Sequence, residues 1–366
     1  MTTRFHSLDG LRAIAASLVV IHHLGAATLA SNLQEAGHTF AGNLIGGLTA
    51  SGVELFFVLS AVVLAGPYVR RERPLNLWAY TFRRISRLLP PYFGAWLLAG
   101  LAIFLATEFP TWWTVGAALP VFSLRDWFSQ IAIVYFGKNY NFAWWSLTVE
   151  VAFYILLPVF ILVFSRLNES GRWAAFGFSL LLAILVAPSL GAYTLMHNLS
   201  LYAACFCAGL VLASGPVNPR TALALVVLGA GWVLVVSHFS QLNQHVGWGT
   251  LYFGLTALAM ERQSIIYRML SKYEFVWLGE RSYSLFLVHF TVIGLVCHAA
   301  SAVIDSKSLG YFLLTRSLSI VLSLVATVVL FHFFERPFAR GLVTGEDVLP
   351  RRGLSPTPDP PQIRRA

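Results

Sequence analysis

The chain has 366 residues, of which 57% are hydrophobic and only 11% are charged, whereas soluble proteins carry about 25% charged residues. A soluble domain of about 300 residues buries only about 75% of its surface, so it could not hide this much apolar area. Despite a formal net charge of +9, the composition excludes a soluble enzyme, a disordered chain and a nucleic-acid-binding protein, and it indicates a polytopic membrane protein.

About ten stretches of the chain are long and apolar enough to cross a membrane as helices, which takes about 20 mostly apolar residues each. We therefore expect an all-α protein with crossings at residues 8–28, 46–66, 91–107, 145–165, 173–190, 197–214, 220–238, 246–261, 281–302 and 310–334. The intervening segment 108–144 contains Trp112, Trp113 and Trp127 together with two prolines, which predicts an interfacial or re-entrant stretch. The first crossing lacks a convincing signal-peptide cleavage site and is expected to be retained.

The basic residues predict the orientation of these crossings. If the N-terminus is cytoplasmic, most of the 25 lysines and arginines fall on the cytoplasmic side, as the positive-inside rule requires. Both termini are then cytoplasmic. Residues 341–366 are rich in proline and polar residues, which is typical of a disordered tail, so the membrane domain is expected to cover residues 1–340.

Several ionisable residues lie inside the predicted crossings, where insertion costs about 2.5–3.5 kcal/mol and a functional role is common. Arg12 and His23 are 11 residues apart, or about three helical turns, so both should project from one face, about 16 Å apart. Counting about 1.5 Å per residue from the outer helix ends places Glu54 and Glu150 at the depth of His23. The sequence therefore predicts an outer layer of histidine and glutamate.

A second, cationic layer is predicted near the cytoplasmic ends. Arg12 lies there, and Arg84 and Arg87 come just before the third predicted crossing. The latter two are three residues apart and would share a helix face. We expect His289 between the layers, about 12 Å from the cytoplasmic end, and Glu335 at the inner surface.

The two layers lead to a hypothesis. The basic layer would bind an extended anionic donor from the cytoplasm, and the imidazole would act as a general base that a carboxylate orients. No acidic pair has the spacing of a metal site, so no bound metal is expected. Structural alternatives stay open. His23 could be a packing histidine, the arginines at 84 and 87 could be ordinary membrane anchors, and the two outer glutamates could accept hydrogen bonds from the indole of Trp144 or Trp145. His289 and Glu335 could likewise have either a structural or a catalytic role.

Six segments in order along residues 5–340 carry a recognisable pattern. They are SLDGLRAIAA at 7–16 running on to His22 and His23, SGVELFFVLS at 51–60, the arginine pair at 84–87, WSLTVE at 145–150 followed by Phe153 and Tyr154, LG at 278–279 running on to SYSL and His289, and FERP at 334–337. Together they resemble the integral-membrane acyltransferase-3 family. Two departures are His22, where an aromatic residue is more usual, and Ala61, where glycine is normal.

The resemblance implies transfer of an acyl group, usually acetyl, from cytoplasmic acyl-CoA to a hydroxyl group of a saccharide, a lipid-linked saccharide or a macrolide. It implies a multi-pass protein of the bacterial cytoplasmic (inner) membrane, with Arg12, Arg84 and Arg87 holding the donor phosphates. His23, oriented by one of the two outer glutamates, would deprotonate the acceptor or carry the acyl group. Many members also have a hydrolase-like domain; here we expect the membrane core and its outer loops to recognise the acceptor.

The alternative is a proton-coupled secondary transporter, because intramembrane histidine and glutamate also form proton relays. Transporters often contain two corresponding repeats, and none is visible in this sequence. The sequence therefore favours the acyltransferase.

Overall fold

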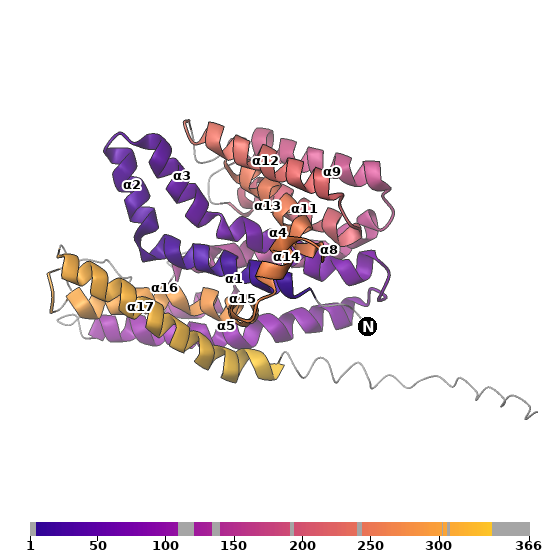
Figure 1. Ribbon diagram of the computed structural model, residues 1–366. Helices are drawn as coiled ribbons and strands as arrows, with labels where there is room; N and C mark the ends of the chain where they lie inside the picture. Colours follow the sequence, from indigo (N-terminus) through magenta and orange to yellow (C-terminus); the bar gives the residue numbers. More distant parts are fainter. Residues whose placement is uncertain are drawn as a thin grey trace, which may run out of the picture.

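The computed structural model describes residues 5–108, 121–133, 140–190, 194–239, 244–301, 303–305 and 308–338. Within these ranges the regular structure is entirely helical, which confirms the all-α prediction (Figure 1). The predicted tail at 341–366 lies outside the described residues, as do 109–120 and 134–139 of the predicted interfacial segment. The part of that segment that is described contains the short helices α7 (Leu124–Ser129) and η2 (Gln130–Ala132).

Eight helical stretches of the described residues are long and apolar enough to cross a membrane, or up to nine if one bent pair counts as a crossing. The eight are His6–Glu35 (α1 His6–Ile21, η1 His22–Ala26, α2 Ala27–Glu35), Thr39–Val69 (α3 Thr39–Ala50, α4 Gly52–Val69), Leu77–Glu108 (α5), Phe142–Phe164 (η3 Phe142–Trp144, α8 Trp145–Phe164), Glu169–Ser189 (α9 Glu169–Leu181, η4 Leu182–Val186, η5 Ala187–Ser189), Pro219–Val236 (α12), Ser282–Ser301 (α16) and Leu309–Phe338 (α17 Leu309–Leu330, η6 Phe331–Glu335). The bent pair is α10 (Leu195–Leu201) with α11 (Ala203–Ser214), at 50°.

This number is lower than the predicted ten because the α10–α11 pair is bent and because α13 (Gln244–Met260) is short. Each expected crossing coincides with helix, but α13 has only 17 residues. At 1.5 Å per residue it is about 26 Å long, which is less than the hydrocarbon thickness of about 30 Å.

The third predicted crossing also begins earlier than expected. The α5 helix is continuous over 32 residues, so Arg84 and Arg87 lie inside it and the prolines at 90 and 91 do not begin it. Proline is tolerated in membrane helices because neighbouring groups can satisfy the freed carbonyls. The arginines are therefore held by a regular helix and not by a loop.

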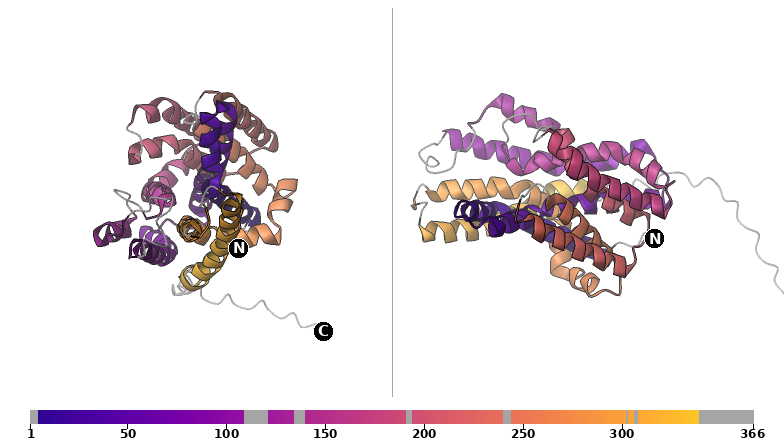
Figure 2. Two further views of the ribbon diagram at one scale, coloured as in Figure 1. Left: turned by 90° about the vertical axis from the view of Figure 1, so that its left-hand side faces the viewer. Right: turned by 90° about the horizontal axis from the view of Figure 1, so that it is seen from above.

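The long helices run side by side, and α2 and α3 extend from the bundle as a hairpin (Figures 1 and 2). Burial separates central from peripheral helices: 72% of the apolar part of Thr39–Val69 and of Ser282–Ser301 is buried, against 22% for Pro219–Val236 and Leu309–Phe338. The central helices α4 and α16 both pack against α1. Candidate site residues on these three helices thus come together inside the bundle.

Glycine allows some of these helices to approach closely. A methyl group at Gly279, in α15 (Tyr273–Glu280), would overlap the Asp9 carbonyl of α1. On the other side of the core, a methyl group at Gly209 of α11 would lie 2.5 Å from the Ala61 methyl of α4. The alanine that departs from the family pattern is therefore accommodated by a glycine on the facing helix.

A local break shapes the first membrane stretch. The α1 helix continues into the π-helical turn η1, in which Gly25 has a φ of 128°. Only glycine adopts such a backbone conformation readily, and π-helical turns occur frequently at functional sites. His22 and His23 both belong to this turn.

Candidate active site

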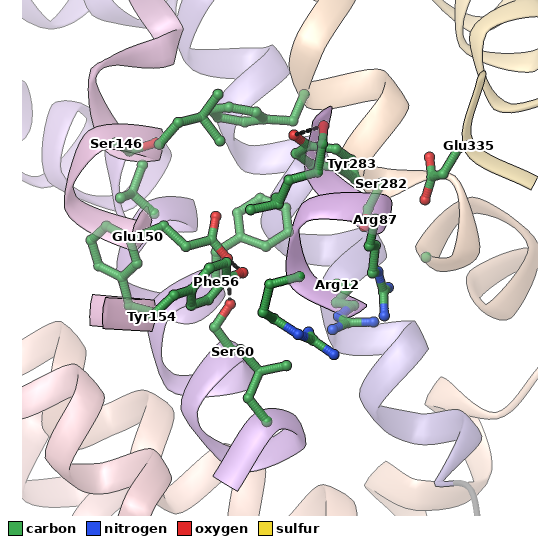
Figure 3. A pocket seen from close by; sticks show the side chains of 18 of the residues that line it. Arg12, Phe56, Ser60, Arg87, Ser146, Glu150, Tyr154, Ser282, Tyr283 and Glu335 are labelled. Atoms are coloured by element: carbon green, nitrogen blue, oxygen red, sulfur yellow. Dashed lines mark hydrogen bonds between the residues drawn. The ribbon is translucent and has the colours of Figure 1, made fainter. Parts of the chain in front are cut away.

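A cavity of about 80 Å³, here called the inner chamber, lies between α1, α4, α5, α8 and α16 (Figure 3). Its charged lining residues are Arg12, Arg84, Arg87, Glu150, Glu280 and Glu335. The structure therefore brings the three predicted arginines together, and it confirms that the two on α5 share a face.

A larger cavity of about 970 Å³, here called the vestibule, adjoins the inner chamber. Arg12, Arg87, Glu280 and Glu335 line both cavities, so the vestibule leads to the charged side of the chamber.

The vestibule has further charged groups on its wall. The Arg70 side chain donates to Glu72 Oε1 at 2.7 Å, and this hydrogen bond lowers the pKa of the Glu72 carboxyl. The Arg281 guanidinium lies between two aromatic rings, 4.4 Å from the centroid of Trp277 and 4.5 Å from that of Phe331. These contacts hold a cation in place beside the cavity.

The chamber arginines differ in their partners. Arg12 lies 3.8 Å from the Asp9 carboxylate. Among the described residues no carboxylate forms an ion pair with Arg84 or Arg87, and the Arg84 Nε is buried without a hydrogen-bond partner. A buried guanidinium without a counter-ion is costly, and a phosphate group in the chamber would compensate it.

Glu150 lies in the inner chamber and not beside His23, so the predicted common layer is wrong for this residue. It accepts hydrogen bonds from Ser60 Oγ at 2.7 Å and from the Tyr154 hydroxyl (Figure 3). The reason is where α8 begins. Buried Asn141, which precedes η3 and α8, donates to the Leu287 carbonyl at 3.0 Å, so α8 starts inside the bundle and Glu150 lies correspondingly deeper.

Glu54 has a different partner from those considered in the sequence. It is only 2% exposed, and its Oε1 lies 2.5 Å from Nδ1 of His245, at the start of α13. The indole of Trp144, one of the predicted hydrogen-bond partners, donates to the Leu287 carbonyl at 3.1 Å. The buried carboxylate is therefore satisfied by an imidazole 191 residues away.

His23 and His289 are in direct contact. His289 Nδ1 lies 2.8 Å from the Phe286 carbonyl and 3.1 Å from the Leu285 carbonyl; since carbonyls only accept, this nitrogen carries a proton. His289 Nε2 is then the acceptor in the neutral ring, and it lies 3.1 Å from His23 Nδ1.

The same reasoning fixes the His23 tautomer. Its Nδ1 faces two acceptors, His289 Nε2 and the Val19 carbonyl at 3.0 Å, so Nδ1 carries the proton. In the neutral ring, Nε2 then has the free lone pair. A histidine, and not the predicted carboxylate, thus orients the candidate base.

His23 and His289 line neither of the two cavities, which differs from the predicted single pocket reaching from the arginines to the imidazole. Phe286 separates the two histidines from the inner chamber, because it lines the chamber and its ring centroid lies 6.0 Å from that of His289. On α16, Phe286 and His289 are three positions apart and share a face.

Glu335, predicted at the inner surface, is buried and accepts a hydrogen bond from Ser284 Oγ at 2.6 Å.

Sequence reasoning missed several residues of this region. His245, the second residue of α13, was not among the candidates, and no local signal links it to Glu54. Phe286 and Tyr154 lie within segments that we singled out, but their roles depend on neighbours from other helices. Within the described ranges, no group of three or more His, Cys, Asp or Glu side chains is placed to hold a metal ion.

Residues 5–334 match the family described as "Acyltransferase domain" of the acyltransferase-3 type. The chain belongs to the acyltransferase-3 family. This match covers every candidate residue except Glu335, which lies one position beyond it, and it gives no support to the transporter alternative. No solved structure matches the chain significantly.

Three relatives illustrate the family. A Staphylococcus aureus (strain COL) protein, whose O-acetyltransferase name is provisional, is 24% identical over 91% of this chain and 57% of its own length. The peptidoglycan O-acetyltransferase OatA of Listeria monocytogenes is 24% identical over 80% of this chain and 51% of its own. The acyltransferase MdmB of Streptomyces mycarofaciens is 26% identical over 46% of this chain and 42% of its own. The chain thus spans little more than half the length of the first two relatives.

Proposed function

We propose that this protein transfers an acetyl group from cytoplasmic acetyl-CoA to a hydroxyl group of a saccharide or macrolide-like acceptor, in the bacterial cytoplasmic membrane. Membership of the acyltransferase-3 family supports the reaction type. The contact chain from the inner chamber through Phe286 and His289 to His23 carries the assignment of roles.

The donor enters from the vestibule and binds through its phosphates. Arg84 and Arg87 lack carboxylate partners among the described residues, and with Arg12 they present three guanidinium groups to one small space. Guanidinium groups match phosphate geometry through paired hydrogen bonds. With its phosphates held there, the donor extends its thioester past Phe286 toward His23, where the reaction takes place.

The acceptor reacts at His23. The Nε2 lone pair takes the hydroxyl proton while the hydroxyl oxygen attacks the thioester carbonyl carbon. The new C–O bond forms, the C–S bond breaks, and the CoA thiolate leaves and takes up the proton, so the products are an ester and free CoA. His289 keeps His23 in the required tautomer.

The experiment uses the purified protein in lipid nanodiscs with acetyl-CoA and a panel of acceptors: muropeptides, lipid-linked saccharides and macrolides. CoA thiol release and acceptor mass are measured together. We expect transfer to at least one acceptor, lowered by about 10²–10⁴-fold in His23→Ala, the usual effect of losing a general base. Exposed His38 supplies the control variant His38→Ala, which should keep full activity. Absence of acyl transfer to every acceptor, or full activity of His23→Ala, contradicts the proposal.

A further inference from the structure

Arg316 of α17 lies beside the turn that carries His23. A methyl group added at Gly25 of η1 would lie 3.3 Å from Nη2 and 3.4 Å from Nε of Arg316, so the guanidinium packs directly against this turn. His23 and Gly25 are two residues apart, and the chain can separate them by at most about 7 Å. The guanidinium and the imidazole are therefore close enough for one saccharide molecule to contact both.

The α16 helix shows on which side of the histidines this arginine lies. Phe286 lines the inner chamber, His289 follows one turn later, and Cys297 comes a further eight residues on, which is about 12 Å along the helix. Arg316 Nη1 lies 3.5 Å from Cys297 Sγ. Accordingly, α17 begins at the end of the bundle opposite the N-terminus (Figure 1). A molecule bound at Arg316 thus approaches His23 from the side opposite the chamber.

The guanidinium is only partly satisfied within the described part of the chain. Its five N–H donors include two on Nη1, which face Cys297 Sγ at 3.5 Å and Thr315 Oγ1 at 3.2 Å, both uncharged acceptors. Its Nε is buried without a hydrogen-bond partner, and no carboxylate of the described residues forms an ion pair with it. The Phe312 ring, 5.0 Å from Cζ, holds the cation but does not neutralise it. An arginine inside a membrane helix is costly and usually serves a function.

We propose that Arg316 binds an anionic group of the acceptor, a phosphate or a carboxylate, while the acceptor hydroxyl faces His23. This inference rests on the proposed acyl transfer at His23 and adds the class of acceptor, a saccharide with a negative charge near the hydroxyl that is acylated. Guanidinium groups bind both kinds of anion through paired hydrogen bonds. Such a pair also fixes the orientation of the acceptor, and a correctly placed hydroxyl reacts faster.

The test measures kcat/KM for two matched pairs of acceptors, with acetyl-CoA as donor and the protein in lipid nanodiscs. One pair is a muropeptide and the same muropeptide with its carboxylates amidated. The other is a polyprenyl-diphosphate-linked saccharide and the free saccharide. The readout is the ratio of the anionic to the uncharged acceptor within each pair, because a general loss of activity cancels in it.

We expect Arg316→Gln to lower this ratio by about 10–100-fold for at least one pair, which is the usual effect of losing a hydrogen bond between charged groups. Arg316→Lys keeps the positive charge and should restore part of the ratio. The pair that responds identifies the anion as a carboxylate of the acceptor or as the diphosphate of its lipid carrier. Arg125, exposed on α7, supplies the control Arg125→Gln, whose ratios should equal those of wild type.

The outcomes separate the inference from the proposed function. Unchanged ratios for both pairs in Arg316→Gln, or a wild-type protein that acetylates only uncharged acceptors, overturn the inference alone. If Arg316→Gln does not fold, Arg316→Met decides by the same ratio, since it keeps an unbranched apolar stem beside the lipid. A wild-type protein that acetylates neither these saccharides nor a macrolide refutes the proposed function, and the inference with it.

Discussion

The contact between His289 and His23 makes the proposed mechanism testable at a residue that need not touch the substrate. Replacing His289 by phenylalanine keeps a ring in this fully buried position but removes the acceptor that lies 3.1 Å from His23 Nδ1. The Val19 carbonyl, at 3.0 Å, still accepts from the same nitrogen. The base should therefore lose part of its orientation and keep its proton-accepting Nε2.

The expected loss follows from one hydrogen bond. A neutral hydrogen bond contributes about 0.5–1.5 kcal/mol net, and about 1.4 kcal/mol corresponds to a tenfold change in rate. His289→Phe should lower kcat by about two- to tenfold, well short of the loss in His23→Ala. In His289→Gln the longer amide reaches the place of Nε2 and supplies an oxygen acceptor, so most of the activity should return.

The assay is CoA thiol release at saturating acceptor, with chromatographic homogeneity and thermal unfolding as controls for folding. A His289→Phe variant with wild-type kcat would refute the orienting role. Equal activities of His289→Phe and His289→Gln would refute it as well. If His289→Phe were as inactive as His23→Ala while folded, His289 would itself take part in the chemistry and the assigned tautomers would be wrong.

Two further predictions concern the donor and the fold. Arg84→Ala should raise KM for acetyl-CoA by about 10–100-fold, because a hydrogen bond to a charged group contributes about 1.5–3 kcal/mol. Arg71 is exposed in a neighbouring loop and gives the control Arg71→Ala. Equal KM values for Arg84→Ala and Arg71→Ala in a steady-state assay would argue against phosphate binding. Gly279→Ala should destabilise the protein by about 1–3 kcal/mol, because the added methyl group overlaps the Asp9 carbonyl. Gly231→Ala, where the added methyl group meets open space, should unfold at or above the wild-type temperature. Equal unfolding temperatures of the two variants would show that α15 can move away from α1.

Local pattern was sufficient for the helices and for residues that share one helix. The three-residue spacing of Arg84 and Arg87 predicted a common face, and both side chains line the inner chamber. The hydrophobic windows located all the helical crossings, although α13 is shorter than a full crossing. These predictions succeeded because hydropathy and helical period are properties of one continuous segment.

Depth and pairing between helices were not accessible in this way. Glu150 was assigned to the layer of His23 by counting from the expected end of its helix, but Asn141 anchors that helix inside the bundle. Similarly, nothing near His245 in the sequence indicates its contact with Glu54.

The sequence by itself determined a helical membrane protein, its family pattern and the residue types available for anion binding and proton transfer. Only the tertiary structure decided that His289 orients His23 from 266 residues away, and that Phe286 separates both from the arginines. The physical reason is that a side chain's spacing along its own helix fixes the face on which it lies, whereas its partner depends on which helices pack against that face and at what depth.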